Sequence, residues 1–253
     1  MSHRERPLLV IPAAGVGSRL RAAVPKALAL VGGRPMLDWL IELYQPHVSA
    51  LALVVSPSHA GWIGDHARRV ATLPVDVFQQ AQPTGMLDAV LAARPAVEHS
   101  LASRIWVTWC DQIAIDPRTL ANLADARYAH TALTMPTVWR RKPYIHFDRD
   151  AAGRISYVRQ RREGDEMPHR GEGDAGVFNF SRAAYLDDLC AYASTLVPGA
   201  MTGERNLLPF IPWLAQRAPV ATFPCAHEVE AVGINTPADL QHVEAFLRRR
   251  ERP

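Results

Sequence analysis

The chain has few cysteines, three in 253 residues, and they lie far apart at positions 110, 190 and 225. Their odd number and the lack of a Cys-x-x-Cys pair argue against a disulfide framework or a thiolate zinc site. The apolar runs are far shorter than a bilayer requires, and residues 1–6 are too polar for a secretory signal. We therefore expect a protein of the reducing cytoplasm with no membrane partner.

Several common catalytic and phosphate-binding signatures are also missing. The ten histidines show no His-Glu-x-x-His spacing, and no Gly-x-Ser-x-Gly elbow marks a serine nucleophile. No Gly-Lys-Ser/Thr follows the early glycines, and Leu20 stands where the dinucleotide fingerprint needs a third glycine. A net charge of +3 from scattered basic residues gives no reason to expect a nucleic-acid partner.

Short apolar runs alternate with helical patterns along most of the chain. We expect strands at 8–11, 50–55, 75–78, 105–109, 131–135, 177–180 and 220–223, and helices that include 35–44, 87–93, 117–128 and one starting at 237. This alternation predicts an α/β fold, with a mostly parallel mixed sheet covered by helices on both faces. We expect one domain over residues 1–253, with a charged insertion at 140–173 over one sheet edge that holds a short hairpin near Gly153.

The segment after the first strand is the most informative one. Small residues and two glycines follow the strand directly, so that backbone N–H groups can approach an anion. Arginine adds a rigid fork of donors matched to phosphate, and lysine adds a point charge a few residues further on. The segment therefore predicts a polyphosphate-binding loop, whose members are Ala13, Ala14, Gly15, Val16, Gly17, Arg19 and Lys26.

Two oxygen-bearing side chains are candidate magnesium ligands. Asp111 directly follows a predicted buried strand, and Asn235 precedes the predicted last helix. Mg²⁺ is typically held by one or two protein oxygens, with phosphates and waters filling the other positions. Taken alone, Asp111 is also compatible with a simple turn cap, and the local sequence favours an Asx turn before the helix for Asn235.

Further polar residues follow the other predicted strands. Gln80 and Gly85 lie on a loop whose glutamine amide can both donate and accept, as reading a pyrimidine edge requires. Glu172 and Asp174 could accept hydrogen bonds from the hydroxyls of an acceptor, or be solvated loop charges. Because the carboxyl ends of parallel strands converge, we expect the loops at 15, 80–85 and 111 to meet at one sheet edge.

Together these motifs resemble the nucleotidyltransferase superfamily of sugar-nucleotide pyrophosphorylases. The resemblance covers nearly the whole chain, rests on the order of residues 13–20, 25–26, 80–85, 111, 172–176 and 233–237, and includes the uridyltransferase domain that makes UDP-N-acetylglucosamine. It implies a Rossmann-like, GT-A-like fold. Cys110 departs from the glycine usual before the metal aspartate, Gln112-Ile113 is atypical, and residues 202–209 have no counterpart with an assigned role.

The resemblance also implies roles for the individual residues. Residues 13–17 would hold the nucleotide, Arg19 and Lys26 would neutralise the triphosphate, and Gln80 with Gly85 would read the base. Asp111 and Asn235 would share the magnesium ion, while Glu172 and Gly176 would face the acceptor. The catalytic set implied is thus Arg19, Lys26 and Asp111.

We therefore expect Mg²⁺-dependent transfer of a nucleotidyl group from a pyrimidine NTP (UTP, CTP or dTTP) to a phosphorylated small-molecule acceptor. A sugar 1-phosphate is the family default, and a phosphorylated alcohol or phosphonate with CTP is the alternative. A non-catalytic nucleotide-binding module is a second class of function, and a glycosyltransferase is disfavoured because Cys110-Asp111-Gln112 lacks an Asp-x-Asp. A homo-oligomer is compatible with the sequence, which does not determine the oligomeric state.

Overall fold

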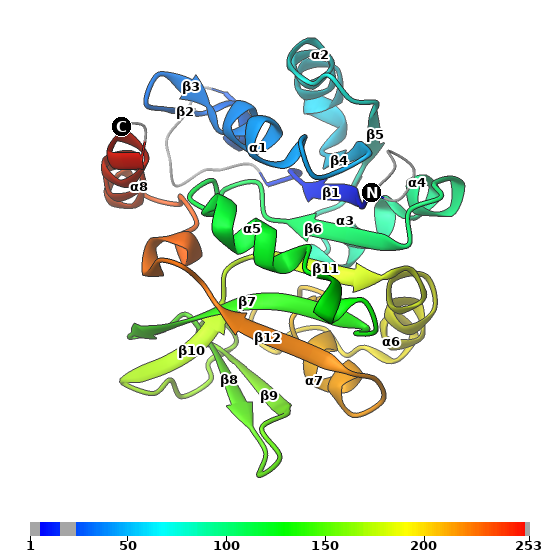
Figure 1. Ribbon diagram of the computed structural model, residues 1–253, viewed down its shortest axis with the longest axis vertical. Coiled ribbons are helices and arrows are strands. Elements are labelled where there is room, and N and C mark those ends of the chain that lie inside the picture. The colour runs from blue at the N-terminus through cyan, green and yellow to red at the C-terminus, as the bar shows by residue number, and fades with distance from the viewer. Residues whose placement is uncertain (1–5, 16–23, 251–253) are drawn as a thin grey trace.

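The computed structural model of the protein describes residues 6–15 and 24–250 and shows an α/β fold built on one central sheet (Figure 1). Eight strands form this sheet. They are β1 (Leu8–Pro12), β4 (Ala50–Val55), β5 (Val75–Gln79), β6 (Arg104–Thr108), β7 (Leu133–Arg141), β10 (Arg170–Asp174), β11 (Val177–Ser181) and β12 (Val220–Pro224).

The sheet has a parallel half and a mixed half. Its order is β10-β7-β11-β6-β1-β4-β5, and β12 pairs with β7 as well. Strands β6, β1, β4 and β5 run parallel, whereas β11 is antiparallel to both β6 and β7. The carboxyl ends of β1, β5 and β6 therefore lie at one edge, as the alternation of short strands and helices predicted.

Alternate residues of β1 face two separate hydrophobic clusters, one on each side of the sheet. Leu9 and Ile11 pack in the first cluster, and Leu8 and Val10 in the second. The helices that cover the first face are α1 (Met36–Tyr44), α2 (Ala60–Val70), α5 (Pro117–Leu123) and α8 (Pro237–Arg250). Those that cover the second are α3 (Met86–Ala92), α4 (Arg94–His99), α6 (Leu189–Thr195) and α7 (Phe210–Ala215).

The predicted insertion at 140–173 is wrong at both of its ends. Strand β7 continues to Arg141, and β10 belongs to the central sheet, so only residues 142–169 lie outside it. Between them β8 (Ile145–Arg149) and β9 (Ile155–Gln160) form a separate hairpin, which projects from the sheet (Figure 1). The sequence is misleading here because edge strands carry charged, solvent-facing side chains and so resemble loops.

Smaller differences concern the ends of elements. The helix predicted at 117–128 ends at Leu123, because Asp125 caps a separate 3-10 turn through the Arg127 N–H at 2.8 Å. Helix α8 begins after Thr236, whose hydroxyl and N–H groups bond Asp239 reciprocally, which is a capping box. A further small hairpin joins β2 (Leu30–Val31) to β3 (Arg34–Pro35). None of the described helices is long and apolar enough to cross a membrane.

Candidate active site

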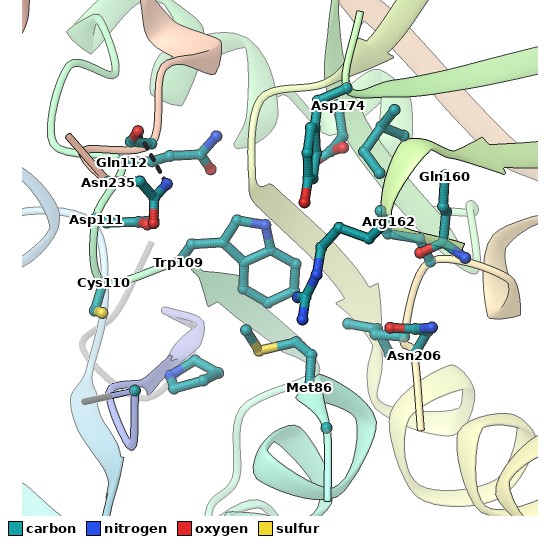
Figure 2. Close-up of a pocket in the computed structure, with 18 of the residues that line it drawn as sticks. Met86, Trp109, Cys110, Asp111, Gln112, Gln160, Arg162, Asp174, Asn206 and Asn235 are labelled. Atoms are coloured by element: carbon teal, nitrogen blue, oxygen red, sulfur yellow. Dashed lines mark hydrogen bonds between the residues drawn. The ribbon is translucent and has the colours of Figure 1, made fainter. Parts of the chain in front are cut away.

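A cavity of about 820 Å³ opens at the edge of the sheet where the parallel strands end. Its walls come from the loops after β1, β5 and β6, from the β10 end, and from residues 204–208 and 231–235 (Figure 2). The predicted meeting of three polar loops is thus present among the described residues. The cavity runs along the sheet edge from the side of β5, past the centre at β6, to the side of β7 and β10.

The centre of the cavity holds a cluster of Lys26, Asp111 and Asn235. The ammonium of Lys26 donates to Asp111 Oδ2 at 2.5 Å and to Asn235 Oδ1 at 2.8 Å. Lys26 opens a short 3-10 helix after Pro25, and only 9% of the residue is exposed. One cation therefore joins two oxygens that come from residues 124 positions apart.

The backbone fixes this cluster from several sides. The Ile234 N–H donates to the Asp111 carbonyl at 3.0 Å, which ties the α8 entry to the loop after β6. The Asn235 N–H donates to Asp239 Oδ2 at 3.1 Å, so the capping box of α8 also orients the asparagine. These contacts do not involve the Asp111 carboxylate, which accepts from the Lys26 ammonium through Oδ2.

The Asp111 and Asn235 oxygens fit a magnesium ion. Both are hard oxygen ligands, both line the cavity, and they already converge on one cationic nitrogen. Within the described residues no group of three or more His, Cys, Asp or Glu could form a richer metal site. A pair of protein oxygens suits Mg²⁺, which keeps several waters and binds phosphates.

The loop after β5 closes on itself through the two residues predicted to read the base. Gln80 Nε2 donates to the Gly85 carbonyl at 2.9 Å. Gly85 has φ +126°, and a Cβ there would stand 2.5 Å from the Arg205 backbone. Both residues line the cavity, so the structure brings them to the β5 side of the site.

The phosphate loop is described only in part. Ala14 and Gly15 line the cavity, and Ala13 is buried just beneath them, with its N–H donating to the Val54 carbonyl at 2.6 Å. A backbone group of Ala13 is therefore already used by the sheet. The predicted binding residues Val16, Gly17 and Arg19 lie outside the described residues.

On the acceptor side, the structure places Glu172 away from the cavity wall. The carboxylate is buried and bound by two nitrogens of Arg149, at 2.8 and 2.7 Å, and Arg149 comes from the β8–β9 hairpin. Gly176 forms the turn between β10 and β11 at φ +68° and is not part of the cavity lining. Asp174, two residues after Glu172, does line the cavity (Figure 2).

Two ionisable groups of the cavity have raised pKa values because they are buried. Burial raises the pKa of Asp174 to about 6, although the Gly176 N–H and the nearby Arg140 both favour the carboxylate. Burial likewise raises the pKa of the Cys110 thiol to about 12, and the Asp111 charge adds to this effect. Cys110 is therefore a neutral thiol at neutral pH and not a nucleophile.

Residues 199–206 overlap the segment 202–209 that sequence reasoning left without a role, and Glu204 and Asn206 of this range line the cavity. Glu163 holds this segment: its carboxylate accepts from the Thr202 hydroxyl at 2.5 Å, from Asn206 at 2.9 Å and from two backbone N–H groups. Burial opposes ionisation, but these bonds outweigh it and lower the pKa of Glu163 to about 2. In the sequence this segment is recognisable only as a polar run, and such a run does not reveal that Glu163 binds it.

The fold and the site define the class of the protein, which is that of the nucleotidyltransferases. The family described as the MobA-like NTP transferase domain matches residues 9–172, and the chain belongs to this family. These residues include the phosphate loop, Gln80, Gly85 and Asp111.

Individual relatives agree with this assignment. The chain is 31% identical over 248 residues to the bifunctional protein GlmU of Pelotomaculum thermopropionicum, covering 95% of this chain and 52% of the relative. It is 30% identical to GlmU of Azorhizobium caulinodans, covering 98% of this chain and 55% of that protein. The chain thus spans about half the length of the curated relatives it matches.

A solved structure shares the fold over the whole chain. The inositol-1-phosphate CTP transferase from T. maritima superposes with a TM-score of 0.72 at 16% identity, covering 98% of both chains. The α/β nucleotidyltransferase fold predicted from the sequence is therefore confirmed.

Proposed function

We propose that the chain transfers a nucleotidyl group from a pyrimidine NTP to a phosphorylated small molecule and releases pyrophosphate. A sugar 1-phosphate is the acceptor that we favour, and a phosphorylated alcohol or phosphonate with CTP is the alternative. The observation that carries the proposal is the joining of Lys26, Asp111 and Asn235 at the centre of one large cavity. This position separates a base-side wall from an acceptor-side wall.

Nucleotidyl transfer of this kind requires neutralisation of the phosphate charges and does not require a general base. An oxygen of the acceptor phosphate attacks the α-phosphorus of the NTP, a new P–O bond forms, and the bond to the leaving pyrophosphate breaks with its electron pair. A phosphate monoester has a second pKa near about 6 and is largely dianionic at neutral pH, so that no protein base has to remove a proton. The chief obstacle is repulsion between the anions, which Lys26 reduces.

The remaining residues bind and orient the substrates. Ala14 and Gly15 would approach the phosphates through their backbone, and Gln80 with Gly85 would position the base. Asp111 and Asn235 would hold Mg²⁺, which supplies positive charge to the phosphates when bound. Positioning of this kind accounts for much of the acceleration in phosphoryl transfer.

A pyrophosphate-release screen tests the proposal. UTP, CTP, dTTP, ATP and GTP are each combined with sugar 1-phosphates, phosphorylated alcohols and phosphonates in the presence of Mg²⁺. We expect release with one pyrimidine NTP and one acceptor class, and loss of that release in Asp111→Ala while the variant stays folded. Nucleotide binding by calorimetry without turnover of any pair would instead favour a non-catalytic module.

A further inference from the structure

Gln112, the residue after Asp111, has a side-chain amide without a hydrogen-bond partner among the residues that the structure describes. Only 6% of the residue is exposed, and its Oε1 is buried without a hydrogen-bond partner. Its amide nitrogen makes no hydrogen bond within residues 6–15 and 24–250 either, but this atom is not among the buried ones, and the residue lines the cavity. Buried amides are normally paired, because leaving one unpaired is costly.

The amide oxygen lies against the turn between β10 and β11, which is on the acceptor side of the sheet edge, and is covered there. A Cβ built on Gly176 would stand 1.1 Å from Gln112 Oε1 and 2.5 Å from the Trp109 ring, so the glutamine fills the side-chain space of that glycine. Gly176 follows β10, whereas Gln80 and Gly85 follow β5 at the opposite end of the sheet. Figure 2 shows the amide between Asp111 and Asp174, above Trp109.

The nearest polar groups explain what the amide can bind. Asp174 accepts from the Gly176 N–H at 2.9 Å and leaves carboxylate capacity toward the cavity. Gln112 and Asp174 together thus present amide and carboxylate groups on one wall, beside the apolar face of Trp109. Hydroxyl groups both donate and accept, and a carbon ring packs on an indole, so that a polyol suits this wall.

We propose that Gln112 determines acceptor specificity by hydrogen-bonding a hydroxyl group of a phosphorylated polyol, a sugar or a cyclitol. This inference rests on the proposed function and narrows its acceptor. A methionine at position 112 would fill the same space without an unsatisfied amide, so that packing alone does not favour glutamine. The polar residue is accounted for by a ligand hydroxyl that accepts a hydrogen bond from its amide nitrogen.

The test compares Gln112→Met with wild type in the full chain, using the NTP and acceptor that give the fastest pyrophosphate release. We expect acceptor kcat/KM to fall about tenfold, which corresponds to the loss of one hydrogen bond, with the KM for the NTP unchanged. Thermal stability should stay equal or rise. Unchanged acceptor kcat/KM, a change confined to the NTP, or a loss of stability would each overturn the inference.

Two matched variants calibrate these readouts. Asn179 is also a buried amide, but it accepts from Arg104 at 2.7 Å and donates to the Leu123 carbonyl at 2.9 Å, so Asn179→Leu should lose stability. Gln216→Met makes the same side-chain change on an exposed residue outside the cavity and should change neither rate nor stability.

Acceptor analogues that each lack one hydroxyl complete the test. For one of these analogues we expect the kcat/KM of wild type to fall about tenfold. The kcat/KM of Gln112→Met should not fall further with this analogue, because the variant already lacks the partner of the missing hydroxyl. Equal penalties in the two proteins for every analogue would overturn the inference, as would faster turnover of a phosphorylated ammonium compound than of any polyol. A wild type that turns over no pair would overturn the proposed function and this inference with it.

Discussion

At the scale of single residues, Lys26 links the two candidate metal ligands through one ammonium group. We expect Lys26→Ala to lower kcat about a hundredfold, by analogy with the removal of one electrostatic stabiliser from an active site. Steady-state pyrophosphate release measures this. Lys26→Arg keeps the positive charge but changes the geometry of the cationic group, and it should recover part of the rate. Near-wild-type turnover of Lys26→Ala would show that the residue has no part in the mechanism.

Asp174 makes stability depend on pH. Its pKa is raised to about 6 by burial, so the folded state favours the neutral acid. Below the ordinary pKa of 3.8 the carboxyl is protonated in both the folded and the unfolded protein, so its burial does not lower the free energy of unfolding. The free energy of unfolding decreases as pH rises through about 6. Arg140, Trp109 and the Gly176 N–H surround the group and limit this loss.

Asp174→Asn should remove that dependence. We expect the variant to exceed wild type in free energy of unfolding at pH 7.5, by at most about 3 kcal/mol for a shift of about two pKa units, and to match it near pH 3.5. Urea unfolding at the two pH values measures the difference. A stability difference that does not vary with pH would mean that the Asp174 pKa is not raised.

Sequence reasoning named the three residues that the structure joins in the candidate site, whereas Glu172, a predicted acceptor contact, does not line the cavity. Lys26 and Asp111 were predictable because each follows a recognisable turn or strand, and Asn235 because it precedes the cap of the last helix. Glu172 and Asp174 lie on the same face of β10, two residues apart, which is about 7 Å along a strand. Only the position of Arg149, on a hairpin far along the chain, decides that Glu172 is sequestered and Asp174 faces the cavity.

At the scale of elements, the turn before α3 depends on Gly85. We expect Gly85→Ala to lose about 1–3 kcal/mol of stability and to raise the KM for the NTP several-fold, because φ +126° strains alanine and its Cβ would collide with the Arg205 backbone. Urea unfolding and steady-state kinetics measure the two effects.

Gly61→Ala provides the control for this substitution. Gly61 lies in α2 with no atom within 4 Å of an added Cβ, so alanine there should be neutral or slightly stabilising. Equal effects of Gly85→Ala and Gly61→Ala on stability and on the KM for the NTP would contradict the close contact between Gly85 and the Arg205 backbone.

Elements differed in how well the sequence predicted them. Buried parallel strands were predicted within a few residues, because their unbroken apolar runs are short and bounded by turn residues. Strand β10 and the end of β7 were not, because at the sheet edge their sequence, Arg-Gly-Glu-Gly-Asp for β10, has no apolar alternation. The pairing of β10 with β7 depends on contacts that local patterns do not contain.

At the scale of the whole molecule, the metal is expected to serve catalysis and not folding. The two hydrophobic clusters lie on the faces of the sheet, and Lys26 already neutralises Asp111. We expect chelation by EDTA to abolish pyrophosphate release while circular dichroism and thermal stability stay nearly unchanged, and Mg²⁺ to restore the activity. Unfolding on chelation would assign the metal a structural role.

The wall at 199–206 joins the two sides of the cavity. The Arg205 N–H donates to the Thr84 carbonyl on the base side, while Glu163 and Arg162 on the acceptor side hold Thr202, Asn206 and Glu204. Exchanging residues 142–169 alone between related enzymes would therefore leave three of these four bonds without their partners. Engineered chimaeras with a new acceptor preference need to transfer residues 142–169 and 199–206 together onto an unchanged nucleotide-binding half.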